Sequence, residues 1–156
     1  MNIFDRFLDL IKTLNEKEVD YILIGGYAVV LHGFTRATQD IDLFINPTEE
    51  NVRKLKSALI KHFNDASIDE ITLSELQKYP VIRYGTDQGF YIDIIVKIGD
   101  VFNYSDLEYE IKEIENVGIR TATASTLLKL KSNTNREIDQ LDIKFLELKI
   151  KRDANK

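Results

Sequence analysis

Two aspartates, Asp40 and Asp42, are separated by a single residue in the apolar segment DIDLFI. Alternate residues of a β-strand point to the same face, so both carboxylates are expected to project together, with their Cα atoms roughly 6.5 Å apart. Two like charges at this distance repel each other, and protonation, a basic partner or a bound cation must relieve the repulsion. Oxygen ligands with this spacing suit a hard ion such as Mg²⁺. An exposed strand face is the simpler explanation for such a pair taken alone.

A third carboxylate, Asp93, lies in the apolar segment FYIDIIV. A charge in such a strand is uncommon unless it is paired or bound to a metal ion. If this strand lies beside DIDLFI, Asp93 completes a set of three carboxylates, which can hold two metal ions for phosphoryl transfer. A paired carboxylate in the core is the alternative for Asp93 by itself.

A glycine pair, Gly25 and Gly26, follows the apolar segment YILI. Without a Cβ atom these residues let backbone N–H groups approach a phosphate closely. A helix starting there would direct further unpaired N–H groups at the same anion. A glycine pair alone is more typical of a simple turn, but glycine pair, Asp-x-Asp and a later strand aspartate in this order form a far more specific pattern.

The elements that must position these residues follow from the spacing of apolar side chains. Apolar residues recur at helical intervals near the N-terminus, and short apolar runs bounded by turn residues indicate strands. Helices are expected over 3–15, 26–32, 48–63, 125–132 and 135–151, strands over 20–24 and 40–45, a β-hairpin over 80–98, and strand character up to 121, while 64–78 is ambiguous. This order predicts an α+β fold with a mixed sheet, flanking helices and a helical C-terminal end.

The composition narrows the class of protein. The chain has 156 residues, the usual size of one domain, and carries no cysteine, which excludes disulfides and thiolate zinc sites. No apolar run approaches the roughly 20 residues of a membrane span, and the N-terminus does not resemble a signal peptide. We therefore expect a cytoplasmic protein with no membrane partner. The net charge of −5 disfavours broad binding of long nucleic acids.

The pattern Gly25-Gly26, a spacer of thirteen residues, Asp40-Ile41-Asp42 and the later Asp93 resembles the nucleotidyltransferase superfamily with the DNA-polymerase-β-like fold. The wider segment is similar to the small prokaryotic members, including toxin-type and abortive-infection enzymes and enzymes that modify antibiotics. The C-terminal LLKLKSNTNREIDQLDIKFL resembles the helical ending of that group. The resemblance implies a single nucleotidyltransferase domain over 1–156, with a catalytic core of about 19–122 and a helical end of about 123–151.

The resemblance also implies roles for individual residues. Asp40, Asp42 and Asp93 would bind Mg²⁺, or alternatively Mn²⁺, and Asp93 has the second interpretation of a base that takes a proton from the acceptor. Gly25 and Gly26 would contact the triphosphate of an NTP such as ATP. Residues of the helical ending that match the pattern and would line the nucleotide site are Lys131, Arg136 and Asp139.

Several residues of the expected nucleotide site have open alternatives, and Lys131 could simply be a solvated side chain. Tyr27 replaces the serine that many superfamily members carry near the phosphates, and it could offer a hydroxyl or simply pack in the core. Arg36, four residues before Asp40, suits a phosphate or the Asp40 carboxylate, but it could equally pair locally on the surface. Arg136 and Asp139 could simply form an ion pair within one helix.

The predicted reaction is transfer of a nucleoside monophosphate from an NTP to an acceptor hydroxyl, with release of pyrophosphate. The acceptor is open between RNA, another protein and a small molecule, and the resemblance adds an antitoxin or a second copy of the chain as partners. The alternative function is a catalytically idle nucleotidyltransferase-like module that binds a partner protein.

Overall fold

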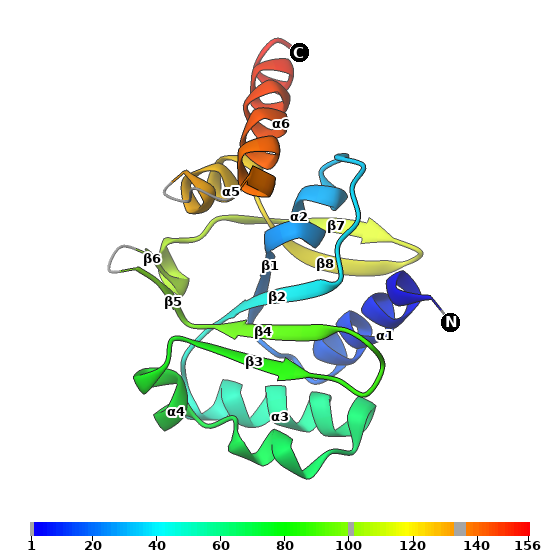
Figure 1. Cartoon of the computed structure of the whole chain (residues 1–156), viewed down its shortest axis with the longest axis vertical. Helices are drawn as coiled ribbons and strands as arrows, with labels where there is room; N and C mark the ends of the chain where they lie inside the picture. Colours follow the sequence, from blue (N-terminus) through cyan, green and yellow to red (C-terminus); the bar gives the residue numbers. More distant parts are fainter. Residues whose placement is uncertain (1, 100–101, 133–136) are drawn as a thin grey trace.

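The computed structural model describes residues 2–99, 102–132 and 137–156 (Figure 1). Its helices are α1 (Ile3–Glu16), α2 (Gly25–Leu31), α3 (Glu49–Phe63), α4 (Leu73–Lys78), α5 (Ala124–Lys131) and α6 (Glu137–Ala154), with 3-10 helices η1 (Ala66–Glu70) and η2 (Tyr104–Asp106). Its strands are β1 (Tyr21–Ile24), β2 (Asp40–Ile45), β3 (Val81–Gly85), β4 (Tyr91–Ile95), β5 (Lys97–Ile98), β6 (Phe102–Asn103), β7 (Tyr109–Ile114) and β8 (Val117–Ala122).

Six strands form one mixed sheet in the order β3-β4-β2-β1-β8-β7, while β5 pairs with β6 separately. The neighbours β2 and β4 run parallel, as do β1 and β8, and the other three pairs of the sheet are antiparallel. In Figure 1, α5 and α6 lie at the opposite end of the molecule from α3 and α4, with the sheet between them. This architecture confirms the predicted α+β fold with its mixed sheet and helical C-terminal end.

Local sequence signals explain where the first and third helices begin. The Asn2 side chain accepts a hydrogen bond from the Asp5 backbone, and Thr48 does the same for Asn51, so each satisfies a backbone donor that the helix leaves unpaired. The apolar face of α1 is buried against the core, as its helical spacing predicts. The helix α3 ends where Asn64 adopts a left-handed conformation with φ 43°.

The structure refines two uncertain segments. The strand character before residue 121 belongs to two strands, β7 and β8, because Glu115 and Asn116 between them both have positive φ, 49° and 67°, which closes a two-residue hairpin turn. The ambiguous segment 64–78 contains η1 and α4, which begin after the side-chain caps Asp65 and Thr72.

None of the described helices combines the length and the apolar character that crossing a bilayer requires.

Candidate active site

The strand register brings the three predicted carboxylates together. The strands β2 and β4 run parallel with Asp42 directly opposite Asp93, while Asp40 lies two residues earlier on β2. Neighbouring residues of paired strands point to the same face, so all three carboxylates lie on one face of the sheet. The expectation that the Asp93 strand lies beside the Asp40–Asp42 strand is thus correct.

The environment of Asp42 disfavours its negative charge. Burial raises the pKa of the Asp42 carboxyl to about 7, the neighbouring carboxylates Asp93 and Asp40 add to this rise, and the Lys131 ammonium opposes it. Asp40 is more open to solvent, with 41% of its side chain exposed, whereas the Asp93 side chain is 11% exposed. The three carboxylates therefore form an electrostatically crowded cluster that attracts a cation.

Gly25 lies against this cluster and must be glycine for two reasons. Its φ of +73° is a conformation that side chains disfavour, and a Cβ atom added there would lie 1.9 Å from Asp42 Oδ2. The end of β1 can therefore approach the Asp42 carboxylate closely only because residue 25 has no side chain.

A cavity of about 410 Å³ opens onto the carboxylates. Part of its wall comes from the sheet and part from α5 and α6, so residues far apart in the sequence share it. Its lining comprises Ile24, Gly25, Asp40, Asp42, Val81, Arg83, Asp93, Ile95, Ile98, Leu127, Leu130, Lys131 and Asp139. The predicted residues Gly25, Lys131 and Asp139 thus line the same cavity as the carboxylates.

A buried ion network joins the C-terminal helices to the loop before β2. The ammonium of Lys131 lies 3.0 Å from Asp139 and 3.1 Å from Asp142, and both aspartate side chains are almost completely buried. Arg36 pairs with Asp142 at 3.0 Å. Its guanidinium is therefore held by α6, and the predicted contact with Asp40 is not formed.

Two other predicted residues lie in different surroundings. Tyr27 is 3% exposed and its ring stacks on Phe7 at 4.5 Å between centroids, so the core alternative describes its placement and the predicted contact with a nucleotide does not follow from it. Gly26 is buried beside Arg36 and Thr38, where a Cβ atom would lie 2.7 Å from each of the two side chains. Arg136 lies outside the described residues.

Arg83 is a site residue that the sequence analysis did not identify. On β3 it lies directly opposite Asp93, and its Nε and Nη2 atoms donate hydrogen bonds of 2.9 and 3.0 Å to the two Asp93 oxygens. The same Nη2 atom donates to Asp40 Oδ2 at 3.3 Å. Taking the glycine-bounded segment 85–89 as the whole turn would pair Arg83 with Tyr91, whereas the structure pairs Gly85 with Tyr91 and therefore Arg83 with Asp93, so counting residues along the sequence does not find this partner.

The cluster has the chemistry of a divalent-metal site, although Arg83 now occupies part of it. No group of three or more Asp, Glu, His or Cys side chains within the described residues is arranged to hold a metal ion as it stands. The donors themselves fit such an ion, because all three are hard carboxylate oxygens on one face of the sheet.

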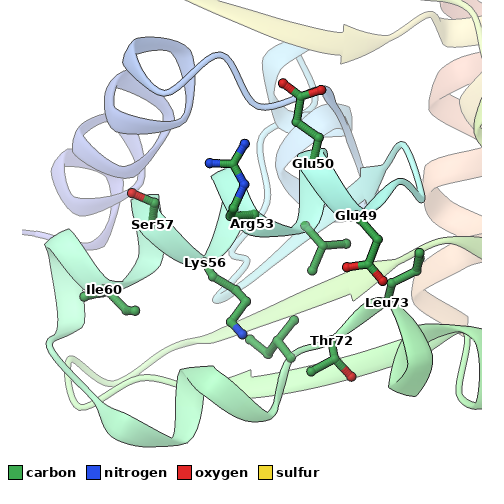
Figure 2. A pocket seen from close by; sticks show the side chains of 10 residues that line it. Glu49, Glu50, Arg53, Lys56, Ser57, Ile60, Thr72 and Leu73 are labelled. Carbon is green, nitrogen blue, oxygen red and sulfur yellow. The ribbon is translucent and has the colours of Figure 1, made fainter.

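A larger hollow of about 830 Å³ lies elsewhere, along α3 and the segment leading into α4. Figure 2 shows Lys56 of α3 extending toward the segment that carries Thr72 and Leu73. Lys56 pairs with Asp69 at 3.9 Å, and Glu50 with Lys54 at 3.5 Å, so charges of this region are matched locally. Size alone therefore does not identify the candidate active site; the gathered carboxylates do.

The mixed sheet, the paired aspartates and the adjacent glycine define a protein of the nucleotidyltransferase type. The chain belongs to the family described as "nucleotidyltransferase of unknown function (DUF6036)", whose model matches residues 1–79. A comparison with curated protein sequences found no match.

Two solved structures share the fold. The lincosamide antibiotic adenylyltransferase LnuA, solved with lincomycin bound, is 18% identical with a TM-score of 0.56, and the match covers 92% of this chain and 94% of LnuA. An antigenic nucleotidyltransferase-like protein from Paracoccidioides brasiliensis is 15% identical with a TM-score of 0.54, covering 92% of this chain and 75% of that protein.

Proposed function

We propose that this protein transfers a nucleoside monophosphate from an NTP to an acceptor hydroxyl. The acceptor oxygen forms a bond to the α-phosphorus as the bond between that phosphorus and the bridging oxygen breaks. Pyrophosphate leaves with the bridging oxygen, and the hydroxyl proton passes to a base or to water. The observation that carries the proposal is the register of Asp42 opposite Asp93, with Asp40 on the same face and Gly25 against them, in a chain of a nucleotidyltransferase family.

The proposed roles of the side chains follow from their positions. Asp40, Asp42 and Asp93 would hold the divalent ions, Mg²⁺ by preference. Such ions, when bound, neutralise charge on the triphosphate and increase the acidity of the attacking hydroxyl. Gly25, which lines the cavity beside Asp42, would present its backbone to the triphosphate, and Lys131 would contribute positive charge to the cavity wall. Catalysis would rest on orientation and electrostatics, without a covalent protein intermediate.

We also propose that residues 1–156 work as one catalytic unit. The helices α5 and α6 supply Lys131 and Asp139 to the cavity, and the pair between Asp142 and Arg36 connects α6 to the loop that leads into β2. The helical end would therefore complete the nucleotide site.

The proposed acceptor is a compact compound that carries a hydroxyl group. The net charge of −5 disfavours a long polyanion. The similarity to LnuA, a lincosamide adenylyltransferase, extends over 92% of this chain and supports a small acceptor as the first choice.

The direct test is incubation with each NTP labelled at the α-phosphate, Mg²⁺, and separate acceptor pools: hydroxyl-bearing small molecules including a lincosamide, total RNA, and protein extract. We expect label in the small-molecule pool with the wild type and none with Asp42→Asn, since that variant loses a metal-binding carboxylate. Glu147→Gln, a change of the same kind at an exposed position of α6, should retain full activity. Transfer by Asp42→Asn at the wild-type rate would refute the assignment.

One observation favours a second candidate function, an idle module that binds a partner protein. Arg83 neutralises Asp93 and Asp40 without any metal ion, so the cluster is compatible with a protein that never binds one. Calorimetry of ATP and GTP binding separates the candidates. An enzyme of the proposed type should bind nucleotide more tightly with Mg²⁺ than with EDTA, whereas equal binding in both conditions would favour the idle module.

A further inference from the structure

Arg83 holds the place among the carboxylates that a cation would take. Its guanidinium binds both oxygens of Asp93 and reaches one oxygen of Asp40. A planar guanidinium with two donors directed at one carboxylate is the strong, bidentate form of this contact. A divalent ion bound by the same oxygens would lie close to this positive charge, and the two cations would repel each other.

A second cationic side chain that lines the cavity, Lys131, forms its ion pairs with aspartates outside the carboxylate cluster. Its ammonium contacts Asp139 and Asp142 at 3.0 and 3.1 Å, and these partners are buried. The Arg83 side chain is different because 53% of it is exposed to solvent. It can therefore leave Asp93 without disrupting the core.

Tyr91 provides the displaced side chain with a second contact. The Arg83 guanidinium lies 4.7 Å from the centroid of the Tyr91 ring, within the range of a cation–π interaction. Tyr91 is half-exposed and lies opposite Asp40 in the register of β2 and β4. A guanidinium that leaves the carboxylates can thus stay at the rim of the cavity, close to any anion bound there.

We propose that Arg83 is the counter-ion of the metal-free carboxylates and that a divalent cation must displace it from Asp93 and Asp40. This inference rests on the proposed function, because it requires that the carboxylates bind a metal ion. In this view Arg83 is a positioning residue that sets metal affinity: it stabilises the metal-free site and competes with the metal for the same oxygens. An NTP, whose phosphates attract a guanidinium, would favour the displaced state and so strengthen metal binding.

The test measures Mn²⁺ binding to the full chain, by the loss of the free Mn²⁺ signal in electron paramagnetic resonance. Wild type, Arg83→Gln, Arg83→Lys and Arg53→Gln are compared without nucleotide. Arg53→Gln is the matched control, since it removes the same charge from an exposed position on α3, outside the cavity. We expect Arg83→Gln to bind Mn²⁺ about tenfold more tightly than wild type, the Lys variant to be intermediate, and the control to be unchanged.

A second measurement follows the displacement in the unmodified protein. The Nε–H signal of Arg83 in ¹⁵N NMR, assigned by its loss in Arg83→Lys, should shift during titration with Mg²⁺, because Nε donates to Asp93 only in the metal-free state. This readout does not depend on whether Arg83→Gln folds. A static Nε–H signal at saturating Mg²⁺ would overturn the proposal.

The possible outcomes distinguish the counter-ion role of Arg83 from the proposed nucleotidyltransferase activity. Equal Mn²⁺ affinity in wild type and Arg83→Gln would overturn the counter-ion role of Arg83 and leave the proposed function standing. No Mn²⁺ binding by any variant, with or without a non-hydrolysable NTP analogue, would overturn both. Tighter binding by Arg83→Gln together with no transfer of labelled nucleotide would support the role of Arg83 and count against the enzyme assignment alone.

Discussion

Replacing Asp42 with asparagine should stabilise the metal-free protein, and the gain should depend on pH. The pKa of Asp42 rises from its ordinary value of 3.8 to about 7 in the folded protein, chiefly through burial and then through Asp93 and Asp40. The folded state therefore binds the proton more tightly than the unfolded chain. The stability that Asp42 contributes is fully present below pH 3.8 and is lost as the pH rises through about 7.

The magnitude follows from the size of this shift. Each pKa unit corresponds to about 1.4 kcal/mol, so the full shift would reduce the free energy of unfolding by about 4 kcal/mol above pH 7. Water has partial access to Asp42, so we expect about 2–4 kcal/mol at pH 8. Asparagine has nearly the same shape and no charge. Asp42→Asn should consequently be more stable than wild type by this amount at pH 8 and differ little from it near pH 4.

The assay is urea unfolding followed by circular dichroism between pH 4 and pH 8, with EDTA present so that metal ions do not compensate the charge. The informative quantity is the difference between variant and wild type at each pH. His32 and His62, whose pKa values are lowered by burial, change stability in the opposite direction, but they cancel in this difference. Glu147→Gln should give a flat line near zero. A flat line for Asp42→Asn as well would refute the electrostatic reasoning about the cluster.

Three further substitutions test separate parts of the structure. Gly25→Ala should lose more stability than Gly89→Ala, for which about 1 kcal/mol is expected, because both have positive φ but only the first introduces a clash; thermal unfolding of both variants measures this. Asn51→Ala should cost about 2–3 kcal/mol in urea unfolding, because the side chain makes three hydrogen bonds to the backbone around the ends of β1 and β2. Asp142→Ala should cost about 3–5 kcal/mol, since it removes a buried partner of Lys131, and an unchanged unfolding midpoint would contradict the importance of this pair.

Local patterns were sufficient to predict the elements that carry the carboxylates. The strand Asp40–Ile45 was predicted with the bounds that the structure has, because apolar and acidic residues alternate along it and a proline-containing turn follows. The hairpin of β3 and β4 was recognisable from its glycine-containing turn. These features depend on neighbours within a few residues, which a single sequence records directly.

Contacts between segments that are distant in the sequence were harder to predict. Arg36 has Asp40 four residues away in the chain, yet it pairs with Asp142, more than one hundred residues away, because α6 folds back over the loop. Tyr27 follows the glycine pair in sequence, but the start of α2 turns its ring toward α1 and Phe7. In both cases the packing of a helix decided the partner, and sequence proximity did not.

The charge balance of the site explains how the fold tolerates three adjacent carboxylates. Arg83 compensates Asp93 and part of Asp40, and the raised pKa of Asp42 keeps much of that carboxyl neutral near pH 7. All three aspartates line the cavity, whereas apolar residues at positions 42 and 93 would need no such compensation. A fold that needed only stability would gain nothing from this cluster, and this cost is the physical reason for proposing that a cation binds there.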